Sequence, residues 1–137
     1  MIAWLRPEVV QAAAMADAWL VQHAAEPFCY LTTVGRRTGK PHEIEIWFAT
    51  LDGRLFMMAG GRGKADWVRN LIHTPGVSVR IGGESRRGTA RVLDEEGEPE
   101  LDARVRRVVA EKYGEVEKDG ALSGWAKTAL PVEVTFV

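Results

Sequence analysis

Residues 59–71 read AGGRGKADWVRNL, and this stretch joins an apolar, strand-like run to a helical pattern. Its three glycines have no Cβ, so the backbone there can turn sharply and approach a ligand closely. A helix that begins just after them directs unpaired N–H groups and the positive end of its dipole toward that ligand. Arg62 and Lys64 add two positive charges. The stretch predicts an anion site, most simply for phosphate, although it matches neither of the common glycine-rich phosphate motifs.

Length and composition are those of one globular domain, which we expect to span residues 1–137. Hydrophobic residues make up 46% of the chain and charged residues 27%, an ordinary balance for a soluble fold. The net charge of −1 argues against nucleic-acid binding, because no basic excess attracts a polyanion. We find no signal-peptide pattern and no integral membrane segment, and we therefore expect a cytoplasmic protein.

Few residues offer catalytic chemistry of their own. Cys29 is the only cysteine and lies in an apolar run, so we expect a small buried side chain. His42 and His73 lack further ligands at metal-binding spacing, and we expect no metal. No nucleophile motif is present, so we name no catalytic residue. Redox chemistry on a bound cofactor remains the most plausible activity.

The hydrophobic spacing predicts six strands, over residues 28–34, 42–50, 55–58, 77–81, 84–93 and 132–136. It predicts three helices, over residues 7–25, 64–73 and 96–113, and leaves residues 114–127 as a loop. On the third helix we expect Arg104, Arg106, Arg107 and Lys112 to face solvent. Short strands joined mostly by hairpins favour a mainly β (α+β) domain, a small antiparallel barrel with flanking helices.

A second cationic loop follows the first strand and carries Arg36, Arg37 and Lys40. In a small barrel this loop and the glycine-rich stretch can converge at one mouth. Trp47 and Trp67 are candidates for flat surfaces nearby. Cations beside aromatic rings suit a ligand with a phosphate and a planar ring, but solvated arginines and core tryptophans would also explain the pattern.

Two segments resemble motifs of the deazaflavin (F420)-dependent nitroreductase family. Residues 31–42, LTTVGRRTGKPH, are similar to its TTxGRxSG/TG segment. Residues 66–71, DWVRNL, with the following PGVSV and GG, are similar to its WxxNLxxxPxVxVxxGG. The resemblance covers roughly residues 31–92, more weakly the C-terminal helix and strand, and the pair of motifs is fairly specific.

The resemblance implies a six-stranded antiparallel split β-barrel and hydride transfer from reduced F420 to a small electrophilic acceptor, such as a quinone, nitroaromatic or enone. It also implies that two loops hold the cofactor's phosphate and tail, at Arg36, Arg37, Thr38, His42, Gly60, Gly61, Arg62, Gly63 and Lys64. Trp67 and Asn70 would brace the loop. Together with Lys40 and Trp47, these are the expected cofactor-binding residues.

One position departs from the family pattern. Better-known members have a tyrosine in the second strand, near the substrate, where this chain has Phe48. Phe48 has no hydroxyl to take the place of the tyrosine's, and this difference argues against nitroreduction in particular. An FMN-binding relative of pyridoxamine-phosphate oxidase and a non-enzymatic cofactor-binding protein remain alternatives. A homodimer is the expected assembly.

Overall fold

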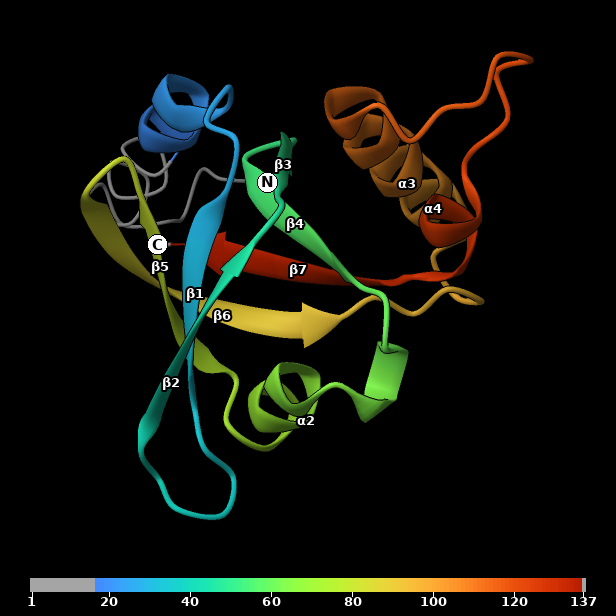
Figure 1. Cartoon of the computed structure of the whole chain (residues 1–137). Coiled ribbons are helices and arrows are strands. Elements are labelled where there is room, and N and C mark those ends of the chain that lie inside the picture. The colour runs from blue at the N-terminus through green and yellow to red at the C-terminus, as the bar shows by residue number, and fades with distance from the viewer. Residues whose placement is uncertain (1–16, 137) are drawn as a thin grey trace, which may run out of the picture.

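The computed structural model describes residues 17–136, and its seven strands form one antiparallel sheet in the order β2-β1-β5-β6-β7-β4-β3 (Figure 1). The strands are β1 (Cys29–Val34), β2 (Pro41–Ile46), β3 (Ala49–Leu51), β4 (Arg54–Ala59), β5 (Gly76–Ile81), β6 (Glu84–Val92) and β7 (Leu130–Phe136). The predicted mainly β fold is confirmed as a split-barrel-like sheet with flanking helices. It has seven strands where six were predicted.

The extra strand arises because the predicted strand 42–50 is broken. β2 ends at Ile46 and β3 begins at Ala49, yet these two strands occupy opposite edges of the sheet. Two residues therefore connect the edges, and the sheet has to curl until the edges meet at one corner. At that corner Tyr113 Oη accepts a hydrogen bond from the Phe48 N–H (3.0 Å), and Lys112 Nζ donates to the Phe48 carbonyl oxygen (2.8 Å). These side chains satisfy backbone groups that a continuous strand would have paired.

Helices flank the sheet at more than one place. A 3₁₀ turn, η1 (Arg62–Lys64), precedes α2 (Asp66–His73), and α3 (Pro99–Tyr113) has its proline in the first turn. The helix α3 contacts β3 near this corner, whereas α2 contacts β1 and β6. Residues 17–23 are helical, whereas residues 7–16 of the predicted first helix lie outside the described residues. No helix within residues 17–136 is both long and apolar enough to cross a membrane.

The predicted loop over residues 114–127 is partly wrong, since it contains the start of α4 (Gly124–Thr128). The Ser123 side chain accepts a hydrogen bond from the Ala126 N–H at 3.1 Å and caps this helix. Only five residues long, α4 leaves too little periodicity in the sequence to be recognised. It packs beside α3 at one end of the sheet (Figure 1).

The core consists of two apolar clusters, and β4 contributes to both. Leu55 and Met57 pack in the barrel interior with residues such as Leu31, whereas Phe56 packs on the other side against Val109 of α3. Because both faces of β4 are buried, its sequence is a continuous apolar run instead of an alternating one. Cys29 is buried in the first cluster, as predicted, and burial raises its thiol pKa to about 12.

Arg106 was predicted to face solvent, but its side chain is buried in α3. Its guanidinium donates to Asp102 (2.9 Å), to Glu95 (2.7 Å) and to the Ala126 carbonyl oxygen (3.0 Å). These three acceptors satisfy the charge, so burial is tolerated where helical periodicity alone assigns the residue to the surface.

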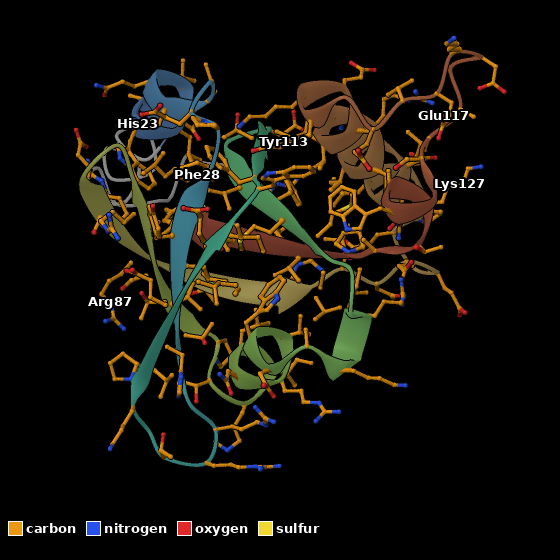
Figure 2. All side chains as sticks on the ribbon, viewed as in Figure 1. His23, Phe28, Arg87, Tyr113, Glu117 and Lys127 are labelled. Carbon is orange, nitrogen blue, oxygen red and sulfur yellow. The ribbon has the colours of Figure 1, made fainter. Side chains whose placement is uncertain are left out.

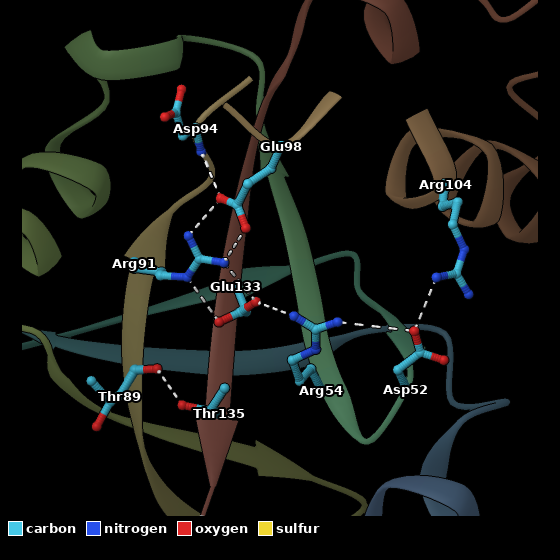
Figure 3. A network of polar contacts seen from close by, with 9 residues as sticks. All are labelled: Asp52, Arg54, Thr89, Arg91, Asp94, Glu98, Arg104, Glu133 and Thr135. Carbon is cyan, nitrogen blue, oxygen red and sulfur yellow. Dashed lines mark hydrogen bonds and ion pairs between the residues drawn. The ribbon is translucent and has the colours of Figure 1, made fainter. Parts of the chain in front are cut away.

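A polar network ties the three neighbouring strands β4, β7 and β6 together (Figure 3). Glu133 of β7 has a side chain only 6% exposed and lies between two arginines. Arg54 donates to it at 2.7 Å and Arg91 at 3.0 Å. Arg91 also forms two hydrogen bonds to Glu98, at 2.7 and 2.9 Å. The network keeps the buried carboxylate paired and extends to the start of α3.

Candidate functional site

A polar cavity of about 450 Å³ lies between the β1–β2 loop, β2 and the start of α2. Six of the residues expected to bind a cofactor line it: Arg36, Arg37, Thr38, His42, Trp67 and Asn70. The two motifs that lie about 30 residues apart in sequence are thus brought into one place, because β1 and α2 pack side by side.

Asn70 fixes the geometry of this cavity. The residue is only 5% exposed, and its Nδ2 donates to Thr33 Oγ1 at 3.2 Å. Its Oδ1 accepts from both the backbone N–H and Nη1 of Arg36, at 3.2 and 2.9 Å. Arg36 Nη2 also donates to Asp66 at 3.1 Å. One buried amide therefore holds the cationic loop against α2, and Asp66 partly neutralises Arg36.

The loop itself is a tight backbone turn. The Gly35 N–H donates to the Lys40 carbonyl and the Gly39 N–H donates to the Gly35 carbonyl, each at 2.8 Å. Gly39 has φ +71°, the left-handed region that glycine adopts without strain. A Cβ on Gly35 would lie 2.6 Å from His42 Nε2 and 2.9 Å from Thr38 Oγ1, so only glycine lets both side chains close over this backbone.

Two cations of this loop are available to a ligand. Arg37 and Lys40 are exposed, and neither side chain forms an ion pair or a hydrogen bond with any residue between positions 17 and 136. Of the two, Arg37 lines the cavity, whereas Lys40 does not. Of the two arginines that line the cavity, Arg36 is paired with Asp66, whereas Arg37 has no ion-pair partner among the described residues.

The glycine-rich stretch lies apart from this cavity, since none of residues 60–64 lines it. Arg62 is engaged elsewhere: its guanidinium pairs with Glu95 and donates to the Thr128 carbonyl oxygen. A Cβ on Gly60 would lie 3.3 Å from Trp125 Nε1. The stretch thus packs toward α4, and among its charges Lys64 is the exposed one.

A second cavity, of about 400 Å³, adjoins the next residues of β2. Residues 42–44 line the polar cavity and residues 45–47 line this one. Its walls are largely apolar and aromatic, from Phe28, Ile46, Trp47, Met58 and Trp125, with Glu45 and Glu115 as its acidic members. We call it the aromatic pocket. Trp47 and Trp67, which the sequence grouped together, line different cavities.

Phe48 stands at the sequence position of the family tyrosine, but it lines neither cavity because its side chain is fully buried. The backbone N–H and carbonyl oxygen of Phe48 contact the hydroxyl of Tyr113 of α3, each at 3.0 Å. Tyr113 was not among the candidate site residues predicted from the sequence. No local signal shows a contact across 65 positions.

Comparison with known families decides the class of protein. The family model described as F420H(2)-dependent quinone reductase matches residues 4–135. The chain belongs to this family. As a member of the F420H2-dependent quinone reductase family, it is an oxidoreductase whose cofactor is coenzyme F420. The predicted resemblance to F420-dependent proteins and the predicted cofactor are confirmed, and the alternative of a non-enzymatic protein is not favoured.

Solved structures support the fold of this F420H2-dependent quinone reductase family member. An F420-H2 dependent reductase, FDR-A, is 24% identical with a TM-score of 0.59, covering 79% of this chain and 92% of the other. A conserved hypothetical protein from Mycobacterium tuberculosis is 23% identical with a TM-score of 0.64, covering 87% and 79%. A putative pyridoxamine 5'-phosphate oxidase from Listeria innocua is 14% identical with a TM-score of 0.64, covering 89% and 93%. Among curated proteins, none matches the chain.

Proposed function

We propose that this enzyme reduces a small electrophilic acceptor with F420H2, and that the acceptor is a quinone. Nitroaromatics and enones are further candidates because they accept a hydride in the same way. The observation that carries the proposal is the pairing of two neighbouring cavities along β2, one polar and cationic, the other aromatic. The polar cavity offers cations to the anionic tail of the cofactor, and the aromatic pocket offers a flat apolar surface to a planar acceptor.

The chemistry of the polar cavity fits the tail of F420. The phosphate and carboxylates of the F420 tail need cations and hydrogen-bond donors. Arg37, Thr38 and His42 supply such groups at the cavity wall. Arg36 is oriented by Asn70, and Lys40 adds a charge at the end of the loop. We propose these residues as the main tail site, with Trp67 as an apolar wall. The glycine-rich stretch, Gly60, Gly61, Arg62, Gly63 and Lys64, would contribute through its backbone and Lys64.

The protein's own part in the reaction is binding and orientation. When bound, reduced F420 supplies a hydride and overall a proton, so a quinone gains two electrons and two hydrogens and becomes the quinol while F420H2 becomes F420. Arg37 binds the anionic tail, and Asn70 keeps the cationic loop in place. The apolar side chains of the aromatic pocket exclude water from the acceptor.

Binding and turnover test the proposal separately. The purified protein is titrated with oxidised F420 and with FMN, and then assayed with F420H2 and 1,4-naphthoquinone. We expect F420 to bind at least about tenfold more tightly than FMN, because its tail carboxylates reach additional cations. We also expect quinone-dependent oxidation of F420H2. Tighter binding of FMN, or no oxidation of F420H2 by any of the three acceptor classes, would contradict the proposal.

Assembly and location belong to the same proposal. We propose a homodimer in the cytoplasm. The exposed apolar side chains Val21 (77% exposed) and Ile72 (62% exposed) support a contact between copies, since large apolar groups at the surface gain from burial. Sedimentation equilibrium of the purified chain measures its mass, and a monomer at micromolar concentration would contradict the dimer.

A further inference from the structure

The aromatic pocket differs from the polar cavity in the sign of its charge. Three aromatic side chains line it, Phe28, Trp47 and Trp125, and no lysine, arginine or histidine does so within the described part of the chain. Its two ionisable residues are both carboxylates, Glu45 and Glu115. The pocket is therefore apolar and acidic, next to a cavity that contains arginines.

Within residues 17–136, neither carboxylate forms an ion pair with a cation. Glu45 Oε1 accepts from the Tyr30 hydroxyl at 2.9 Å, and Glu115 Oε1 accepts from the Ser123 hydroxyl at 2.9 Å. Both of these partners are neutral. Arg80 lies over the Tyr30 ring, but it is paired with Glu43. The pocket therefore keeps negative charge next to its apolar wall.

The wall is also held in position before any ligand binds. Trp47 is 41% exposed, and it stacks on Tyr113 with 4.3 Å between ring centroids and 5° between planes. Trp125 meets Trp47 edge-on, at 5.5 Å and 86°. Two fixed neighbours thus set the orientation of an indole that still presents surface to solvent. A preorganised aromatic surface favours a planar ligand because little side-chain freedom is lost on binding.

We propose that the aromatic pocket is the acceptor site and that it selects planar acceptors without negative charge. This inference rests on the proposed function, because it assigns the binding of the acceptor in that reaction to one pocket. It adds that the charge of the acceptor decides how tightly it binds. An anion in this pocket would lose its hydration and face two carboxylates, whereas a neutral or cationic ring would not. Neutral quinones fit this rule, and acidic quinones do not.

The first test uses the cofactor-free protein and needs no turnover. Quenching of tryptophan fluorescence follows binding of 1,4-naphthoquinone and of its 2-sulfonate, which share the ring and differ in charge. We expect the neutral quinone to bind roughly tenfold more tightly. The double variant Glu45→Gln, Glu115→Gln should tighten sulfonate binding roughly fivefold and change neutral binding less than about twofold. Glu117→Gln is the matched control, since Glu117 is exposed and does not line the pocket (Figure 2).

Equal affinity for the two quinones in the wild-type protein would overturn the inference. So would a double variant with an unchanged ratio of the two affinities, or an equal change in Glu117→Gln. Equilibrium dialysis of 1,4-naphthoquinone with saturating oxidised F420 tests whether the cofactor and the quinone compete for the aromatic pocket. Simultaneous binding supports an acceptor site, and displacement of the quinone by F420 overturns it.

Kinetics separate this inference from the proposed function. In the holoenzyme, the double variant should lower KM for the sulfonate roughly fivefold, whereas the control Glu117→Gln should leave that KM within about twofold of wild type. Charge-dependent quinone binding without F420H2 oxidation contradicts the proposed function and leaves the pocket assignment in place. Normal F420H2 oxidation with equal KM values for 1,4-naphthoquinone and its 2-sulfonate contradicts the pocket assignment alone.

Discussion

The indole of Trp47 lies flat on the phenol ring of Tyr113, and the Tyr113 hydroxyl contacts the residue next to Trp47. That hydroxyl accepts from the Phe48 N–H (3.0 Å) and lies within donating distance of the carbonyl oxygens of Pro27 (2.8 Å) and Phe48 (3.0 Å). Tyr113 thus serves both the aromatic pocket and the corner where the two edges of the sheet meet. Its ring supports the indole, and its hydroxyl supports the backbone.

Replacing Tyr113 separates these two roles. Tyr113→Phe keeps the ring and removes the hydroxyl, which leaves the Phe48 N–H without its partner. We expect the free energy of unfolding in urea to fall by about 1–2 kcal/mol, with naphthoquinone affinity within about twofold of wild type. Tyr113→Leu also removes the stack, so quinone affinity should fall roughly fivefold. Equal quinone affinities in the two variants would show that the stack does not support the pocket.

Arg37 is expected to bind the cofactor tail without taking part in the chemical step. Arg37→Ala should weaken oxidised F420 binding roughly 10- to 100-fold, as the loss of a charge-assisted hydrogen bond does, and change kcat at saturating F420H2 less than about threefold. Fluorescence titration and steady-state kinetics measure the two quantities. Arg87→Ala is the control, since Arg87 is an exposed arginine of β6 outside the polar cavity (Figure 2). An unchanged F420 dissociation constant in Arg37→Ala would refute this role.

Asn70 couples stability to cofactor binding. Asn70→Ala removes the acceptor of two Arg36 hydrogen bonds and the donor to buried Thr33, so the free energy of unfolding should fall by about 2–3 kcal/mol. The loosened loop should also weaken F420 binding roughly tenfold. His73→Ala on the same helix is the control, because that side chain is exposed and its replacement should change stability by less than about 0.5 kcal/mol. A destabilised Asn70→Ala protein that binds F420 normally would show that the brace serves the fold alone.

Glu98 makes stability depend on pH in the acid range. Two hydrogen bonds from Arg91 lower the Glu98 pKa from 4.5 to about 2 (Figure 3). The folded protein binds this proton less readily than the unfolded chain, so the stabilisation is complete above about pH 4.5 and is lost as the pH falls toward 2. Wild-type Tm should exceed that of Glu98→Gln at pH 7, and the gap should shrink below pH 4.5.

The exposed neighbour Glu96 provides the control for this pH dependence, since it forms no ion pair with the described residues. Thermal scans of Glu96→Gln should follow the wild type at every pH. A Tm gap for Glu98→Gln that stayed constant down to pH 2.5 would contradict the assignment to this carboxylate.

The polar cavity is the part of the site that sequence reasoning anticipated best. Glycines flank the cationic loop, and Asn70 belongs to the helix segment that resembles the family motif, so these residues were predicted together as a cofactor site. The glycine-rich stretch was predicted to converge with the cationic loop at one end of the barrel, because the sequence shows its charged residues but not their ion-pair partners. Glu95, which pairs with Arg62, is 33 positions away, and no local pattern reveals that pair.

The sequence by itself determined the strands, the hairpins and the cationic loop, because alternation, helical period and turn residues act over a few positions. Asp52 and Gly53, for example, both adopt the positive φ that a tight hairpin needs. Only the tertiary structure decided that the predicted strand 42–50 breaks at Phe48, that Arg106 is buried, and that Trp47 and Trp67 line different cavities. Each of these depends on partners distant in the chain, which satisfy a backbone group or a charge only after the sheet has curled.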